Sequence, residues 1–131
     1  MTDQQLVDAA VEAGKRAYAP YSAFPVGAAL LTETGEVFTG CNVENASYGL
    51  TICAERVAAC RAVAEGQRRF RAIAVVSRTG ATLCGTCRQF LAEFGQDLHV
   101  LIGRLDGTFS STTLRQLLPF AFGSNDLDAD D

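Results

Sequence analysis

The spacing of apolar side chains along the chain predicts a succession of helices and strands. Leu6, Val7 and Ala10 recur with the period of a helix, and Thr2 with Gln5 offers a capping box at its start. Continuous or alternating apolar runs bounded by turn residues are typical of strands. Together these patterns predict helices at 3–17, 53–66, 88–95 and 112–119, and strands at 26–32, 37–43, 72–77 and 99–103.

The order of these elements predicts the fold class. The turn at 33–36 joins the first two strands into an antiparallel hairpin, and helical crossovers connect the later strands. This succession predicts a three-layer α/β domain, and we expect one domain over 1–131 because no repeat or linker interrupts it. The acidic tail from about residue 124 is expected to be mobile.

Charge and hydropathy narrow the classes of partner. The 131 residues include 11 basic and 15 acidic side chains, for a net charge of −4. Nucleic-acid binding usually needs a basic face, so a small, nearly neutral or cationic substrate fits better than a nucleic acid. The chain has neither a run of about 20 apolar residues nor a basic, apolar leader at its start. We therefore expect a cytoplasmic protein with no membrane partner.

The cysteines are spaced as metal ligands rather than as disulfide partners. There are five, an odd number, and a reducing compartment disfavours a disulfide framework. Cys84 and Cys87 form a C-x-x-C, while Cys53 lies 31 positions earlier at the start of the preceding predicted helix. Because these two helices flank one predicted strand, their N-termini meet at the same edge of the sheet. Three sulfurs can converge there.

A helix N-terminus favours thiolate, the form of cysteine that binds Zn²⁺. Three protein ligands leave a fourth tetrahedral position for water, which is the arrangement of catalytic zinc. A structural site would need a fourth side chain. Cys60 lies about 10 Å down its helix from Cys53 by helix rise, and His99 is expected at the opposite edge of the sheet. Cys41 lies within a strand and remains open as a fourth ligand.

Two charged residues lie close to the first cysteine. Glu55 follows Cys53 by two positions, and zinc deaminases carry such an x-E as a general acid and base that is not a ligand. An exposed acid favoured by the helix dipole is the alternative for Glu55. Arg56 shares a helix face with Cys53, so it either offsets the excess negative charge of three thiolates or is a surface arginine.

Longer motifs extend this similarity over most of the chain, from about Tyr18 to Leu127. They are YSAFPVGAAL at 21–30, GCNVENASYGLTICAER at 40–56, CGTCRQFLAEF at 84–94 and LLPFAF at 117–122. In these motifs the chain resembles the small cytidine deaminase family, in its homotetrameric three-cysteine form. The resemblance implies a cytidine deaminase-like α/β/α sandwich with a mixed five-stranded sheet. It also implies hydrolysis of cytidine and 2′-deoxycytidine to uridine and 2′-deoxyuridine, with release of ammonia in pyrimidine salvage.

The resemblance assigns a role to each matching residue. It implies one Zn²⁺ per subunit on Cys53, Cys84 and Cys87, with Glu55 carrying protons. The remaining roles concern the substrate and its neighbours: Phe24 stacks on the pyrimidine, the backbone at Ala54 bonds the base, Asn42 and Glu44 hold the ribose, and Phe122 reaches a neighbouring subunit's site. From the residues alone, Asn42 equally fits a turn, and Phe24 and Phe122 equally fit a core or an interface.

The chain departs from the family pattern at two positions, and three other functions are also compatible with its motifs. Leu83 stands where the family usually has proline before its C-x-x-C, which we expect to loosen that loop, and Ala23 replaces a larger polar side chain. The rivals are a deaminase of cytosine-containing antibiotics, a single-strand nucleic-acid editor, and a non-catalytic zinc or redox C-x-x-C protein. Neither departure touches a predicted ligand.

Overall fold

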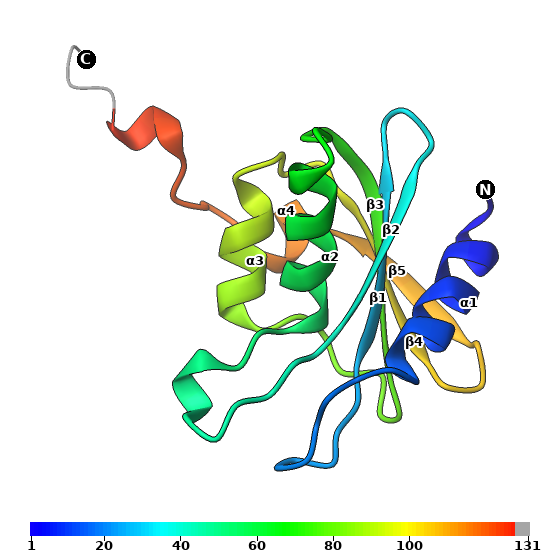
Figure 1. The fold of residues 1–131 in the computed structure, drawn as a ribbon. Helices are drawn as coiled ribbons and strands as arrows, with labels where there is room; N and C mark the ends of the chain where they lie inside the picture. The colour runs from blue at the N-terminus through cyan, green and yellow to red at the C-terminus, as the bar shows by residue number, and fades with distance from the viewer. Residues whose placement is uncertain (128–131) are drawn as a thin grey trace.

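The computed structural model describes residues 1–127, which form a five-stranded sheet between two helical layers. In Figure 1, α2, α3 and α4 cover one face of the sheet and α1 covers the other. The elements are α1 (Asp3–Gly14), β1 (Gly27–Thr32), β2 (Val37–Cys41), η1 (Tyr48–Leu50), α2 (Ala54–Ala64), β3 (Phe70–Ser77), α3 (Gly85–Ala92), β4 (His99–Arg104), β5 (Phe109–Thr113), α4 (Leu114–Leu117) and η2 (Ser124–Leu127).

The sheet is mixed, with strand order β2-β1-β3-β4-β5. β1 pairs antiparallel with β2 and with β3, whereas β3 and β4 are parallel and are joined by α3. β5 closes the other edge antiparallel to β4. The three-layer α/β/α class, the hairpin and the helical crossover predicted from the sequence are therefore confirmed.

Each face of the sheet has its own apolar core. Ile73, Val75 and Val100 point to the side where α2 and α3 pack, and Leu91 of α3 is fully buried there. Ala74 and Leu101 point to the opposite side, against Leu6 and Val7 of α1. Strands that are buried on both faces read as continuous apolar runs, which explains the patterns at 26–32 and 72–77.

Several predicted boundaries differ from those in the structure. The first helix ends at Gly14 rather than at 17, where its backbone lies close to Gly27 of β1. The strand predicted at 37–43 ends at Cys41, and the helix predicted at 88–95 runs over Gly85–Ala92. Helix α3 therefore begins directly after Cys84, with Cys87 in its first turn. The capping box of Thr2 and Gln5 forms as predicted.

The polar segment before the last helix was not recognised as a strand. Residues 109–111, to which no element was assigned, and the predicted helix start at 112–113 form β5, and α4 covers Leu114–Leu117 instead of 112–119. β5 is an edge strand that is largely exposed, so its sequence FSSTT has no apolar period to reveal it. Of the tail predicted to be mobile from residue 124, 124–127 form a 3₁₀ turn and 128–131 lie outside the described residues.

The topology brings the starts of two helices to one end of the sheet. α2 runs antiparallel to β3 and begins near the strand's C-terminal end, and α3 begins just after that end (Figure 1). Among residues 1–127, no helix has the length and apolar character needed to cross a bilayer. The chemistry predicted from the sequence therefore depends on what these two helix starts carry.

Candidate active site

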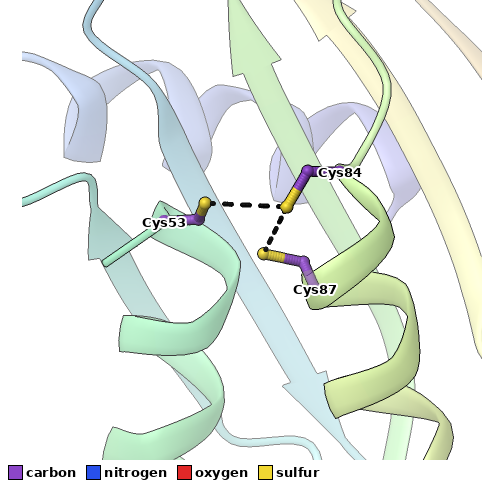
Figure 2. A group of neighbouring side chains, drawn as sticks. All are labelled: Cys53, Cys84 and Cys87. Carbon is purple, nitrogen blue, oxygen red and sulfur yellow. Dashed lines mark hydrogen bonds between the residues drawn. The ribbon is translucent and has the colours of Figure 1, made fainter. Parts of the chain in front are cut away.

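Three cysteine sulfurs meet at the starts of α2 and α3, as Figure 2 shows. Cys53 is the residue that caps α2, Cys84 caps α3, and Cys87 lies in the first turn of α3. Neither capping cysteine bonds its own helix through its side chain. Both sulfurs are therefore free to face the space between the two helices.

The spacing of the sulfurs fits a zinc ion. Cys53 Sγ lies 3.8 Å from Cys84 Sγ, which lies 3.5 Å from Cys87 Sγ, and the three sulfurs lie within 4.8 Å of one another. Tetrahedral Zn²⁺ with Zn–S bonds of about 2.3 Å places its sulfurs about 3.8 Å apart. A small concerted adjustment of the three side chains would satisfy one ion, and thiolates are ligands that zinc prefers.

The described residues bring no fourth ligand into this cluster. The metal-binding group comprises the three sulfurs, and Cys41, Cys60 and His99 are not part of it. His99 begins β4, at the end of the strands opposite the starts of α2 and α3 as expected, and its Nε2 lies 3.3 Å from Asp3 Oδ2. The side chains of residues 1–127 thus leave one tetrahedral position open, as catalytic zinc requires.

The sulfurs are held in an electrostatic setting that favours a thiolate at Cys53. A hydrogen bond from the Cys87 thiol, together with the Arg56 guanidinium, lowers the pKa of Cys53 to about 5. The pKa of Cys87 is raised, because its thiol donates to Cys53 and is partly desolvated. Arg56 Nη2 lies 3.9 Å from Cys53 Sγ and donates to the Thr51 carbonyl at 3.3 Å. Arg56 is therefore not a free surface side chain.

Glu55 is buried beside the cluster, so it is not the exposed helix-start acid that was its alternative. Its side chain lies in the first turn of α2 and the residue is only 4% exposed. Burial raises the pKa of Glu55, and the negative charge of Cys53 adds to the effect. A carboxyl group with a raised pKa in a pocket is suited to accept and return a proton near neutral pH.

Glu55 lines a pocket of about 160 Å³. Four other residues to which the sequence assigned a role also line this pocket: Phe24, Asn42, Cys53 and Ala54. The rest of the lining is apolar or small and comes from β3, the segment before β1 and the loops before α2 and α3: Val26, Thr51, Val75, Ser77, Ala81 and Thr82. The pocket therefore joins one sulfur of the cysteine cluster and the Glu55 carboxyl group to a mostly apolar wall, as is usual for small-molecule sites.

Asn42 and Glu44 both reach the segment 21–26, which precedes β1. Asn42 Oδ1 accepts from the Val26 amide at 2.9 Å, and Asn42 Nδ2 donates to the Phe24 carbonyl at 3.0 Å. Glu44 Oε1 accepts from the Ser22 amide at 3.1 Å, and its other oxygen accepts from the Ser22 hydroxyl. The two side chains therefore organise this segment, a role that was not predicted from the sequence.

Glu44 belongs to a second pocket that adjoins the first. This pocket, of about 330 Å³, is lined by Tyr21, Ser22, Glu44, Tyr48 and Thr51. Thr51 lines both pockets, so they meet at this residue. The first pocket therefore lies next to the cysteines, and the second, which shares Thr51 with it, carries the Glu44 carboxylate.

Phe122 does not line either of these pockets. It follows α4, its ring is half exposed, and its carbonyl accepts from Gln89 Nε2 at 2.8 Å. The exposure argues against the core position that was one alternative for this residue. Within one chain, Phe122 and the cysteine cluster do not form a common site.

Two arginines support the site and were missed in the sequence. Arg88 donates to the Leu83 carbonyl and to the Leu117 carbonyl, each at 2.8 Å, and so ties the loop before Cys84 to α4. Arg78 donates to the Ala23 carbonyl at 2.7 Å. These contacts span up to 55 positions of sequence, and no local pattern signals them.

The loop before the C-x-x-C is supported at Leu83, although this residue replaces the usual proline. Its side chain is 1% exposed and packs in the core under α2 and α3. Its carbonyl is held by Arg88. Burial and a charge-assisted hydrogen bond fix the backbone where proline would restrict it by its ring.

Comparison with known proteins agrees with this site. Residues 1–102 match the family described as the cytidine and deoxycytidylate deaminase zinc-binding region. Cytidine deaminases of Sporosarcina psychrophila and Halalkalibacterium halodurans are 46% and 48% identical over 130 residues, covering 97% of this chain and 96% and 98% of theirs. The crystal structure of cytidine deaminase from Burkholderia pseudomallei is 51% identical and superposes with a TM-score of 0.90, over 93% of this chain and 100% of that one. With these cysteines at the starts of α2 and α3, the chain belongs to the zinc-binding cytidine and deoxycytidylate deaminase family.

Proposed function

We propose that this protein is a zinc-dependent deaminase of cytidine and 2′-deoxycytidine. The products are uridine or 2′-deoxyuridine and ammonia, which places the reaction in pyrimidine salvage. The observation that carries the proposal is a buried carboxyl group, Glu55, in a pocket that also contains a sulfur of a three-cysteine cluster. Cys53, Cys84 and Cys87 hold one Zn²⁺. The ion, when bound, supplies Lewis acidity that lowers the pKa of a water in its open position.

Glu55 carries protons between the water and the substrate. Its carboxylate takes a proton from the attacking water and delivers it to N3 of the cytosine ring. The oxygen attacks C4. The same carboxylate then takes the remaining proton from the new C4 hydroxyl and gives it to the amine, so that the C4–N bond breaks, the C4 carbonyl forms and ammonia leaves. One water is consumed for each ammonia released, so the overall step is balanced. A positioned general acid and base of this kind contributes about 10²–10⁴ in rate.

The base and the sugar of the nucleoside occupy the two adjoining pockets. Phe24 stacks on the pyrimidine in the smaller pocket, and the backbone at Ala54 hydrogen-bonds the ring. Asn42 and Glu44 bind the ribose. Each has capacity left for this, because an amide keeps a second N–H and a carboxylate has about four acceptor sites. Two neighbouring pockets that share Thr51 favour a nucleoside over a free base.

Arg56 offsets part of the negative charge of the three thiolates. Three thiolates outweigh one Zn²⁺ by one negative charge, which weakens the ion as a Lewis acid. A guanidinium group 3.9 Å from Cys53 Sγ withdraws part of that charge. Arg56 thus supports the metal through its ligand and does not contact the substrate.

We further propose that the protein assembles as a homotetramer. Exposed apolar side chains gather near the larger pocket and in the C-terminal segment, and among them Tyr48 is 74% exposed, Leu50 65% and Phe120 104%. Exposed groups of this kind are typical of interaction surfaces. Phe122 then reaches the site of a neighbouring subunit, which accounts for its distance from both pockets of its own chain. Light scattering on the purified protein measures the assembly directly.

We place the protein in the cytoplasm. The site needs three reduced cysteines, and a reducing compartment keeps thiols in that form. Fractionation of cells with a marker for each compartment tests this placement.

The test of function is a spectrophotometric assay of cytidine, with and without a chelator. We expect loss of cytidine absorbance with stoichiometric ammonia, abolished by the chelator and restored by zinc. A cytosine-containing antibiotic, single-stranded DNA and single-stranded RNA serve as competing substrates, and turnover of any of them in preference to cytidine would replace the proposal. A zinc-loaded protein that turns over none of them would be a structural zinc protein.

A further inference from the structure

Phe24, which lines the smaller pocket, follows a residue in a high-energy backbone conformation. Ala23 has φ of 54°, in the left-handed region that residues other than glycine rarely adopt. Such a conformation persists only where the surroundings hold it in place. Phe24 is itself only partly buried, so core packing does not fix the ring. Other contacts must therefore determine where this aromatic wall lies.

Two of these contacts come from the residues that follow β2. Asn42 binds the backbone at Phe24 and Val26, and Glu44 binds the amides of Tyr21 and Ser22. Both residues leave the Ala23 carbonyl and the Phe24 ring untouched. The segment 21–26 is thus held along its backbone, and the Ala23 amide also donates to the Ala19 carbonyl at 3.0 Å. None of these bonds reaches the Ala23 carbonyl or the Phe24 ring, which need a separate support.

Arg78 supplies that support. It follows the last residue of β3 and lies at the end of the sheet where α3 begins. One of its terminal nitrogens, Nη1, donates to the Ala23 carbonyl at 2.7 Å, and its Cζ lies 4.6 Å from the centre of the Phe24 ring. A guanidinium at this distance from a ring is in the range of a cation–π contact. Arg78 therefore holds the carbonyl of the strained residue and the ring that follows it with one side chain.

Arg78 is not among the residues that line the smaller pocket, although Phe24 is. It is exposed and makes no hydrogen bond to the cysteine cluster, Glu55 or Asn42 within the described residues. Any influence of Arg78 on the reaction must therefore pass through Ala23 and Phe24. This separates it from Arg56 and Arg88, which act on the cysteines and the loop before them.

We propose that Arg78 is a positioning residue for substrate binding, which fixes the Phe24 ring at the wall of the base pocket. The inference rests on the proposed function, because it assumes that a nucleoside base stacks on Phe24. Without Arg78 the ring and the Ala23 peptide sample other conformations, and the substrate must order them when it binds. That cost applies to the substrate complex and to the transition state alike. Uniform loss of this kind raises KM and leaves kcat unchanged.

The experiment compares kinetics of wild-type protein, Arg78→Ala and Arg78→Lys with cytidine, at a temperature well below the unfolding midpoint. For Arg78→Ala we expect KM to rise about tenfold and kcat to stay within about twofold. Arg78→Lys keeps a cation and a donor, so it should recover most of the wild-type KM. Arg71→Ala is the matched control, since Arg71 is an exposed arginine near the opposite end of β3 whose Nη2 also donates to a backbone carbonyl, that of Glu33, at 3.2 Å.

A double-mutant cycle with Phe24→Leu shows whether Arg78 acts through the ring. In the Phe24→Leu background, adding Arg78→Ala should change KM by less than about threefold, because there is no ring left to position. Full additivity of the two changes overturns the role, as does a KM for Arg78→Ala that matches wild type and the Arg71→Ala control. Wild-type protein that does not deaminate cytidine overturns the proposed function itself. An active wild type with an unaffected Arg78→Ala overturns only the role of Arg78.

Discussion

Gly40→Ala tests whether the position of α2 against the sheet sets the metal site. Gly40 lies in β2, directly under the first turn of α2, and a Cβ atom built there would lie 2.5 Å from the Ala54 carbonyl oxygen and 2.6 Å from the Ala58 nitrogen. Ordinary contact begins at 3.4 Å, so the strand and the helix backbone must separate by about 0.9 Å. Neither neighbour is the flexible end of a side chain that could turn away.

This displacement acts on one part of the ligand set only. Cys53 and Glu55 move with α2, whereas Cys84 and Cys87 stay with α3. Zinc–ligand distances tolerate about 0.2 Å, so a shift of about 0.9 Å opens the cluster well beyond that range. We expect zinc affinity to fall at least as much as on loss of a ligand-supporting contact, about 10–100-fold. Overpacking should also cost about 1–3 kcal/mol in the free energy of unfolding.

The assay is a zinc competition titration with a chromophoric chelator, combined with thermal unfolding and cytidine turnover. Gly27→Ala is the control for overpacking alone, because its Cβ would meet the Ala10 carbonyl oxygen of α1, on the face of the sheet opposite the cysteines. Gly103→Ala, whose nearest neighbour is the Val76 side chain at 3.1 Å, is a milder version of the same control. Wild-type zinc affinity in a folded Gly40→Ala protein would refute the reasoning, since overpacking would then have left the cluster intact.

Three further predictions follow from the same contacts. Glu55→Gln should keep one zinc per chain and bind cytidine, yet lose about 10²–10⁴ in kcat, and near-normal turnover would remove Glu55 from the mechanism. Cys87→Ser should lose zinc by metal analysis whereas Cys60→Ser, an exposed cysteine on α2 outside the cluster, should retain it, and equal zinc contents would contradict the ligand assignment. The Ser22 hydroxyl and the amides of Tyr21 and Ser22 lower the pKa of Glu44 below its ordinary value of 4.5, so the folded state gains stability above pH 4.5 that is lost as pH falls through the lowered pKa. Melting curves between pH 6 and 3 should show a steeper acid decline for wild type than for Glu44→Gln, and parallel curves would oppose this.

The convergence of the three sulfurs could be predicted because it follows from topology. Cys53 and Cys84 precede helices that flank one strand, and the direction of a parallel crossover brings such helix starts together. Glu55 could be placed next to the metal for the same reason. Its burial could not be predicted, because that depends on the pocket walls contributed by the segment before β1 and the loop before α3.

What escaped prediction depends on contacts between distant segments or on backbone geometry. β5 is polar and owes its form to pairing with β4, so its own sequence carries no strand period. The left-handed Ala23 has no local signature, since glycine is the residue expected there. Asn42 was predicted as a ligand for ribose, yet in the structure both polar atoms of its side chain first hold the backbone at Phe24 and Val26.

The cysteines at the starts of α2 and α3 occupy positions where helices usually carry serine, threonine, aspartate or asparagine. Such residues would protect the first turn by accepting from its amides, and Cys53 and Cys84 do not. Each helix therefore lacks a side-chain cap, and an ion bound by these cysteines would instead tie the two helix starts to each other. In the metal-free protein the first turns of α2 and α3 should fray first. Loss of metal would then cause local unfolding at these turns before the whole domain unfolds.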